Sequence, residues 1–151
     1  MEKAYFPLFV DLSEKKILVI GGGHIAARRI GTLTGFARHI TVVAPRLRPE
    51  LEALAAEGRI SPVRRAFEDA DLAGAELVIA ATDSREINDR ICTLCAERGI
   101  PVNVIDDPAR CDFFFPGIVR DGSVVVGVTA SGTDHKKARS VTEAIRELFK
   151  K

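Results

Sequence analysis

The sequence predicts an α/β fold in which a parallel β-sheet carries helices on both faces. Short continuous apolar runs at residues 17–20, 40–43 and 77–81 are typical of strands that are buried on both sides. Stretches with helical spacing separate these runs, and such alternation favours right-handed βαβ crossovers. The glycine triplet Gly21–Gly23 lies between the first run and the first helical stretch. A glycine turn in that place makes the predicted sheet Rossmann-type.

Apolar residues recur at helical spacing between the strands. We expect helices at three ranges of the chain, namely 25–37, 47–57 and about 83–98. Gly58 and Gly99 are predicted to end the second and third helices. Thr82 or Asp83 is expected to cap the third helix, with Glu86 at the position of a capping-box acid.

Two weaker strands complete the predicted sheet. Residues 60–65 have the pattern of a short strand, and Pro62 indicates an edge position because proline lacks a backbone donor. Residues 101–105, after the third helix, are predicted to be the fifth strand.

The pattern changes after Asp107. Residues 113–120 and 123–129 are two extended runs around Asp121-Gly122, a dipeptide typical of hairpin turns. A helix is expected from about residue 136 to residue 149. One hairpin and one helix are too small to be stable alone, so this segment must pack on the first domain or on a second copy of itself.

The chain is therefore predicted to have two parts, a nucleotide-binding domain at 1–112 and a β-hairpin plus helix at 113–151. The second part includes Phe113–Phe115 and Val124–Val126, which offer more apolar surface than a short hairpin can bury on one domain. Apolar patches of that kind mark interfaces. We expect a homodimer built through residues 113–151.

Composition limits the classes of function. The 151 residues are 46% hydrophobic and 28% charged, which is ordinary for a globular protein. No apolar run approaches the roughly 18 residues of a membrane span, and the N-terminus lacks the features of a signal peptide. We therefore expect a cytoplasmic protein with no membrane partner. A formal net charge of +1 gives no indication of nucleic-acid binding.

Basic residues gather in the last part of the chain. Residues 108–151 contain eight Lys or Arg and five Asp or Glu, a net charge of +3 in a chain whose total is +1. A solvated helix face and a site for an anionic ligand are both compatible with this distribution.

The three cysteines do not predict a disulfide framework or a metal site. Their number is odd, and Cys92 and Cys95 fall inside a helical pattern with no second pair and no histidine nearby. We expect buried or half-buried helix cysteines, and no metal ligands are assigned.

The glycine triplet is part of a G-x-G-x-x-A motif that runs from Gly21 to Ala26. Gly21 would permit the tight turn, and Gly23 would let the backbone approach a pyrophosphate at the helix N-terminus. Ala26 would allow close packing of helix against strand. With a strand before it and a helix after it, the motif predicts dinucleotide binding. A tight turn without a ligand is the alternative.

The end of the second strand departs from the usual fingerprint. An acidic residue is expected there to bind the adenosine ribose, but residues 43–48 contain no carboxylate. Arg46 or Arg48 would suit a 2′-phosphate, or simply a solvated helix start. The expected cofactor is NAD, and NADP stays open.

Several longer stretches resemble a known family. They are Phe6–Leu12, Val19–Arg29, Ala80–Asp83 with Asn88, Asn103–Pro108, and Cys111–Phe113 with Pro116. Together they resemble precorrin-2 dehydrogenase, the N-terminal module of siroheme synthases, over nearly the whole chain. The glycine motif is shared with many dehydrogenases, whereas the N-V-x-D-x-P…C-D-F-x-x-P pattern is much more specific.

The resemblance implies an activity and a catalytic residue. Members of this family oxidise precorrin-2 to sirohydrochlorin with NAD⁺, some also insert Fe²⁺, and they form homodimers. The resemblance makes Asp106 the catalytic residue. The residues themselves agree, since Asp106 would lie at the carboxyl end of a parallel strand, where ligands bind in open α/β sheets. A turn cap is the alternative, because Asp106-Asp107-Pro108 is also good turn chemistry.

The resemblance and the motif together assign the binding residues. The cofactor-binding residues are Gly21, Gly22, Gly23, His24, Ile25, Ala26, Pro45, Arg46, Thr82, Asp83, Asn88 and Val104. The substrate-binding residues are Arg110, Asp112, Phe113, Pro116, Ser131, His135, Lys136 and Arg139.

Two departures from the family bear on activity. His135 and Lys136 replace a Ser-Pro pair, and we expect the family's C-terminal helical module to be short or absent. Both leave iron insertion open. His135 is either a substrate or metal group or a solvated residue at a helix start. An NAD(H)-sensing regulatory module and a dehydrogenase for another small anion remain as alternatives.

Overall fold

The structure is a computed structural model and describes residues 4–151. These residues form two compact units. We call residues 10–113 the Rossmann unit, and residues 4–9 together with 114–151 the C-terminal unit. The second unit thus includes an N-terminal segment that the sequence-based division had placed in the nucleotide-binding domain.

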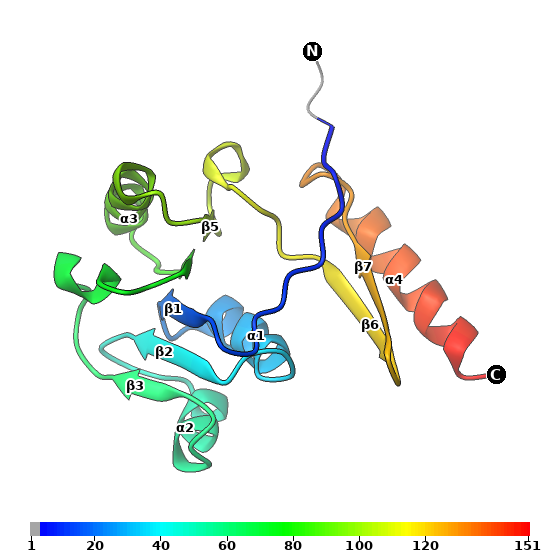
Figure 1. The fold of residues 1–151 in the computed structure, drawn as a ribbon, viewed down its shortest axis with the longest axis horizontal. Helices are drawn as coiled ribbons and strands as arrows, with labels where there is room; N and C mark the ends of the chain where they lie inside the picture. The colour runs from blue at the N-terminus through cyan, green and yellow to red at the C-terminus, as the bar shows by residue number, and fades with distance from the viewer. Residues whose placement is uncertain (1–3) are drawn as a thin grey trace. The chain divides into compact units, whose positions relative to one another are not determined.

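The Rossmann unit is built on a parallel sheet (Figure 1). Its strands are β1 (Lys16–Ile20), β2 (His39–Val43), β3 (Ser61–Val63), β4 (Leu77–Ala80) and β5 (Val102–Val104). Their order across the sheet is β3-β2-β1-β4-β5, and every neighbouring pair is parallel. The predicted parallel sheet is confirmed. β3 lies at one edge, as Pro62 indicated.

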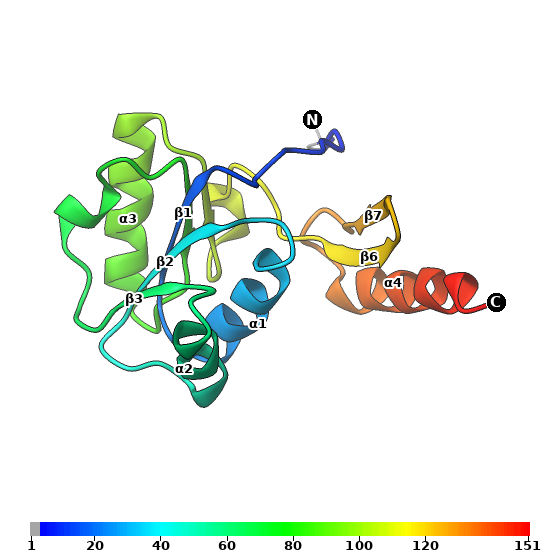
Figure 2. The same cartoon turned by 60° about the horizontal axis from the view of Figure 1, so that its bottom comes forward.

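Helices cover both faces of this sheet. They are α1 (His24–Leu33), α2 (Pro49–Ala56) and α3 (Arg85–Arg98). Figure 2 shows α1 and α2 on one face and α3 on the other. Two short 3₁₀ helices, η1 (Asp69–Leu72) and η2 (Pro108–Arg110), fall in the connections, where the sequence had predicted none.

The strands supply most of the buried core, as their apolar runs predicted. Val19 in β1, and Val78 and Ile79 in the neighbouring β4, are fully buried. α3 contributes Cys92 and Cys95, which are buried free thiols, so the expectation of buried helix cysteines is confirmed for both. Burial is the main cause that raises the pKa of Cys95, to about 11.

The start of α3 differs from the prediction. Ser84 caps it, with its hydroxyl accepting a hydrogen bond from the backbone N–H of Ile87. Glu86 is therefore the second helical residue and cannot complete a capping box, which needs the third. The hydroxyl of Thr82, which we had expected as a possible cap, instead bonds Asn88.

Glycines lie just after the ends of α2 and α3. Gly58 and Gly99 adopt left-handed conformations with φ of 72° and 66°, so their predicted places after α2 and α3 are confirmed. α2 begins at Pro49, two residues later than predicted, because proline suits a first turn. α1 ends at Leu33 rather than Ala37, and non-helical turns follow it.

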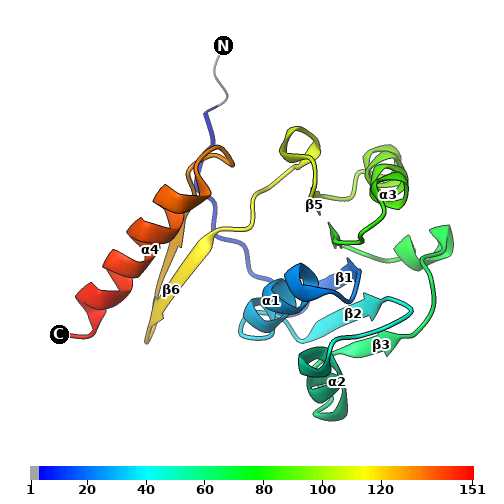
Figure 3. The same cartoon turned by 180° about the vertical axis from the view of Figure 1, so that it is seen from behind.

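The C-terminal unit contains an antiparallel hairpin and one helix (Figure 3). Its elements are β6 (Gly117–Asp121), β7 (Val124–Val128) and α4 (His135–Phe149). Gly122, with φ of 57°, and Ser123 form the turn. The predicted hairpin and helix are confirmed, but the first strand begins four residues later than expected, since residues 113–116 form no strand.

α4 lies along the hairpin, with Thr142 buried against β6. A Cβ at Gly117 would overlap the Thr142 side chain, so the strand carries glycine where the helix approaches most closely. The Thr142 hydroxyl donates to the carbonyl of Ala138 at 2.7 Å. Arg146 donates to the carbonyl of Ile118 at 3.2 Å.

Many apolar side chains of the chain are exposed. The large ones are Tyr5, Phe6, Leu8, Phe9, Val10, Ile25, Val124, Val141 and Leu148. Within the C-terminal unit, Tyr5 contacts Phe114, with ring centroids 4.6 Å apart. In residues 4–151 no helix is both long and apolar enough to cross a membrane.

Candidate dinucleotide and active site

The order of strands reverses between β1 and β4. The chain runs from β1 outward to β3 and then returns to β4 on the other side of β1. The carboxyl ends of β1 and β4 therefore form the topological switch point, where open α/β sheets bind ligands. β1 is followed by Gly21, and β4 by Ala81 and Thr82.

Two of the three glycines are required by the chain's own packing. Gly21 has φ of 126°, and a Cβ there would overlap the carbonyl oxygen of Ala81. A Cβ at Gly22 would likewise overlap the carbonyl oxygen of Arg46. The Gly21 N–H donates to the carbonyl of Val43 at 2.9 Å. These contacts hold the turn close against the loops after β2 and β4.

Gly23 is different, because its Cβ position is open. No heavy atom lies within 4 Å of it, and φ of −85° suits any residue. Gly23 is also the N-cap of α1, so it supplies no side chain to that helix start. A glycine that the chain's own packing does not require leaves a cradle that a Cβ would fill, and this fits a pyrophosphate at the helix N-terminus.

The start of α1 also lacks any negative charge. Among the four α-helices of residues 4–151, it is the one with neither a side-chain cap nor an acidic residue in its first turn. His24 and Ile25 are exposed there, while Ala26 is fully buried and allows helix and sheet to approach. The uncompensated N–H groups and the helix dipole therefore favour an anion.

The loop after β2 carries two exposed arginines. Arg48 pairs with Glu50 at 3.4 Å. Arg46 follows the exposed Pro45 and has no side-chain partner within the described part of the chain. Residues 44–48, the loop after β2, therefore present the cation of Arg46 and no carboxylate at this end of the sheet.

Asp106 follows β5 and is exposed. Its Oδ2 accepts a hydrogen bond from Nδ2 of Asn88, in α3, at 3.1 Å. Asn88 also bonds Thr82, and Thr82 follows Ala81, whose carbonyl lies against Gly21. The structure thus joins the glycine turn to Asp106 through residues that the sequence had assigned to the cofactor. Buried Val104 ends β5 beside them, and exposed Asp83 lies in the loop after β4.

Asp107, the acid next to Asp106, has a structural role. Asp107 caps η2, accepting a hydrogen bond from the N–H of Ala109 at 3.1 Å. The turn chemistry recognised in the sequence is therefore carried by Asp107, and Asp106 remains available at the surface.

Some residues assigned to substrate are engaged elsewhere in the Rossmann unit. Arg110 donates to Asp89 at 3.0 Å and to the Thr93 hydroxyl at 3.2 Å, both on α3. The carboxylate of Asp112 accepts the backbone N–H of Val102 at 2.9 Å. The structure does not bring these two side chains to Asp106.

Asn103 is a polar residue that the sequence analysis did not assign. It is 3% exposed in the middle of β5. Its Oδ1 accepts a hydrogen bond from Arg29, and its Nδ2 donates to the carbonyl of Phe113 at 2.8 Å. Burial is the main cause that lowers the pKa of Arg29. The sequence held one signal that could have found Asn103: an amide inside an otherwise apolar strand is buried and needs hydrogen-bond partners.

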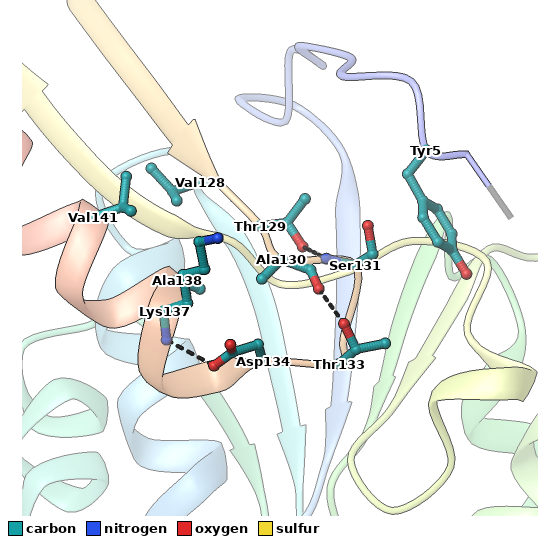
Figure 4. A pocket seen from close by; sticks show the side chains of 10 residues that line it. All are labelled: Tyr5, Val128, Thr129, Ala130, Ser131, Thr133, Asp134, Lys137, Ala138 and Val141. Atoms are coloured by element: carbon teal, nitrogen blue, oxygen red, sulfur yellow. Dashed lines mark hydrogen bonds between the residues drawn. The ribbon is translucent and has the colours of Figure 1, made fainter. Parts of the chain in front are cut away.

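The C-terminal unit has a pocket of its own, of about 660 Å³ (Figure 4). Its lining residues are Tyr5, Val128, Thr129, Ala130, Ser131, Thr133, Asp134, Lys137, Ala138 and Val141. Ser131 is the one assigned substrate residue in this lining. Lys137, which the sequence analysis did not single out, is its basic residue.

The other assigned residues of this unit lie outside the pocket lining. Exposed His135 and Lys136 begin α4, and Arg139 is exposed one turn later. Pro116 lies beside Gly127 of β7. Asp134 caps α4 by accepting the N–H of Lys137 at 2.9 Å. Over residues 4–151, no group of three or more His, Cys, Asp or Glu is arranged to hold a metal ion.

A Rossmann sheet with a glycine cradle at its switch point defines a dinucleotide-binding protein. Comparison with known families agrees, since residues 8–117 match the family described as "Putative NAD(P)-binding". The chain belongs to this family.

Two of the relatives that the chain resembles are siroheme synthases. The chain is 41% identical over 145 residues to the siroheme synthase of Thioalkalivibrio sulfidiphilus, covering 96% of this chain and 30% of the relative. It is 42% identical over 143 residues to that of Methylobacillus flagellatus, covering 95% and 31%. The chain thus spans about a third of the length of these relatives.

A solved structure shares the fold. The protein named "SirC, precorrin-2 dehydrogenase" superimposes with a TM-score of 0.82 at 23% sequence identity, covering 95% of this chain and 71% of that chain. The likeness extends over both units, and so includes the hairpin and α4.

Proposed function

We propose that this chain oxidises precorrin-2 to sirohydrochlorin with NAD⁺, a step of siroheme biosynthesis. One observation carries the proposal: the exposed carboxylate of Asp106 is linked through Asn88 and Thr82 to the loop that lies against the glycine turn. A dinucleotide cradle and a base at the same end of one sheet are what a dehydrogenase requires. The names of the relatives support this choice of substrate.

The proposed reaction removes a hydride and a proton from the substrate. NAD⁺, when bound, supplies the hydride acceptor. The cradle at Gly23 and the start of α1 hold the pyrophosphate, since their N–H groups face an open and uncompensated site. Asp106 accepts the proton on its carboxylate. No residue of the chain changes its redox state.

The substrate is rich in carboxylates, and the C-terminal unit offers cations to meet them. Lys137 lines its pocket, and exposed Lys136 and Arg139 lie on the first turns of α4. We propose that this unit contacts the acidic side chains of the substrate. His135 belongs to the same helix start in this proposal.

We propose NAD⁺ rather than NADP⁺ as the working cofactor, because NAD⁺ is the cofactor that the resemblance to precorrin-2 dehydrogenases implies. The unpartnered Arg46 is the feature that would favour a 2′-phosphate, whereas Arg48 is already paired with Glu50. Measuring kcat/KM for both cofactors distinguishes them, and a larger value for NADP⁺ would reverse the assignment.

We also propose a cytoplasmic homodimer. The exposed apolar residues of the C-terminal unit, among them Phe6, Leu8 and Leu148, support an interface with a second copy of the chain.

The direct test is incubation of the chain with precorrin-2 and NAD⁺ without oxygen. Sirohydrochlorin and NADH should appear together, in equal amounts, in their absorption spectra. Calorimetric titration of NAD⁺ is run in parallel. A chain that binds NAD⁺ but forms no product would overturn the proposal in favour of an NAD(H)-sensing module. Adding Fe²⁺ to the product mixture tests siroheme formation separately.

A further inference from the structure

We propose that Asn88 is a positioning residue for this reaction: its side-chain amide fixes the carboxylate of Asp106 for proton transfer. The inference rests on the proposed function, because it gives Asp106 the role of base. It changes the part assigned to Asn88, from cofactor contact to a residue that acts through Asp106.

The amide of Asn88 uses its full hydrogen-bonding capacity on two residues. Its Nδ2 donates to Oδ2 of Asp106 at 3.1 Å and to the carbonyl oxygen of Thr82 at 3.1 Å. Its Oδ1 accepts from the hydroxyl of Thr82 at 2.6 Å and from the backbone N–H of Thr82 at 3.2 Å. A carboxamide has two donor hydrogens and two acceptor lone pairs, and all four are engaged.

These partners also decide which way the amide points. The backbone N–H of Thr82 can only donate and its carbonyl can only accept, so Oδ1 must face the first and Nδ2 the second. The reversed amide would set its oxygen against a carbonyl and a carboxylate. Asn88 therefore presents an N–H to Asp106, a choice that the chain's own hydrogen bonds determine.

Asn88 is held inside the core, whereas Asp106 is exposed. Asn88 is 0% exposed on α3, a helix of 14 residues that Ser84 caps and that packs into the core. Asp106 is exposed in a short loop between β5 and η2. Within residues 4–151, the Asp106 side chain accepts a single hydrogen bond, the one from Asn88. It holds Oδ2 and leaves Oδ1 to accept the substrate's proton.

Burial argues against direct contact between Asn88 and a cofactor. Its amide has no free donor or acceptor to offer a ligand, and breaking one of the existing bonds would leave a buried polar group unsatisfied. Thr82 and Asp106 instead form the surface that a ligand meets. Asn88 thus connects the loop beside the glycine turn to the base, and sets the distance between them.

A double-mutant cycle tests this role. Asn88→Ala should lower kcat roughly 10- to 100-fold, since small displacements of a base are costly. The Kd for NAD⁺, measured by calorimetry, should change less than about twofold. In an Asp106→Ala background, Asn88→Ala should lower kcat by less than about twofold, because residues that act as a unit are not additive. Asn88→Asp serves as a second variant, since it keeps the volume and the acceptor for Thr82 but loses the donors to Asp106 and to the Thr82 carbonyl, and it should lower kcat at least as much.

Cys95→Ala is the matched control. It also removes atoms from a fully buried side chain of α3, but Cys95 has no bond to Asp106, so kcat should not change. Equal effects of Asn88→Ala in both backgrounds, or a large rise in the Kd for NAD⁺, would overturn the role of Asn88 while leaving the proposed function intact. A wild-type chain that binds NAD⁺ and forms no sirohydrochlorin would instead overturn the proposed function, and this role with it.

Discussion

The backbone of Gly21 lies directly against the carbonyl oxygen of Ala81, with no room for a Cβ between them. This contact brings the turn after β1 and the loop after β4 together at the switch point of the sheet. Gly21→Ala should destabilise the fold by about 2 kcal/mol or more, because φ of 126° and the overlap both penalise a side chain. Urea unfolding measures the change. A variant as stable as wild type would show that the turn relaxes readily.

Gly23→Val, in contrast, should weaken NAD⁺ binding while leaving stability nearly unchanged. Its Cβ position is open and φ of −85° is ordinary, so the free energy of unfolding should change by less than about 1 kcal/mol. The branched side chain would fill the cradle, and the Kd for NAD⁺ should rise at least roughly tenfold. Calorimetric titration measures it. Unchanged affinity in the folded variant would contradict the assignment of the cradle.

The contrast between these two glycines shows what the sequence contained. The motif predicted the turn, the helix after it and the parallel sheet, since apolar runs and glycine positions are local signals. It did not show that Gly21 and Gly22 are required by packing and Gly23 is not, because the atoms of Ala81 and Arg46 that decide this come from distant parts of the chain.

The same limit applies to the polar network. The sequence placed Asp106 at a strand end and Asn88 on a helix, but a hydrogen bond between residues 18 positions apart has no local signature. The cap of α3 is a case where three local signals competed. Thr82, Asp83 and Ser84 are all good cap residues, and the bond of Thr82 to Asn88 is what leaves the cap to Ser84.

The thiol of Cys95 should be unreactive in the folded protein. Burial, and then the neighbouring Cys92, raise its pKa to about 11 from an ordinary 9.0. At pH 8 about one thiol in 10³ would be ionised, and only the thiolate is alkylated. Mass spectrometry after iodoacetamide treatment should find Cys95 modified in urea but not in native buffer. Rapid native alkylation would contradict the packing of α3.

The same pKa shift predicts how stability depends on pH. The folded pKa lies above the unfolded one, so this contribution is fully present below about pH 9 and is lost as pH rises toward about 11. Between these values the unfolded chain ionises while the folded chain does not. Cys95→Ala should therefore lose less stability than wild type from pH 9 to pH 10, in urea unfolding. Equal losses would contradict the shift.

Sedimentation should show a dimer at micromolar concentration. Val124 is 48% exposed and Leu148 is 63% exposed in the C-terminal unit, where apolar surface supports the proposed interface. The double variant Val124→Asp, Leu148→Glu should shift the equilibrium toward monomer, because interfaces exclude unpaired charge. Glu147→Gln is the control, since Glu147 is an exposed neighbour that pairs with Lys150. A wild-type monomer would reject the proposed homodimer.

The two adjacent acids after β5 give the sharpest comparison. Asp106→Ala should lower the turnover of precorrin-2 by roughly 10²-fold or more, as loss of a general base does. NAD⁺ affinity and stability should be nearly intact, because Asp106 is exposed and its side chain makes one hydrogen bond, to Asn88. Asp107→Ala removes the cap of η2 and should cost about 1 kcal/mol of stability with a much smaller effect on turnover.

The pair of variants separates chemistry from local structure. Asp106 and Asp107 share charge, size and neighbourhood, so a general effect of removing a carboxylate near the site would appear in both. Only a role of Asp106 as base predicts that kcat falls in one variant and unfolding changes in the other. Wild-type turnover by the Asp106→Ala variant would make the catalytic assignment wrong. If both variants lost activity in the same proportion as stability, the acids would act on the loop after β5, and the base would have to be sought elsewhere.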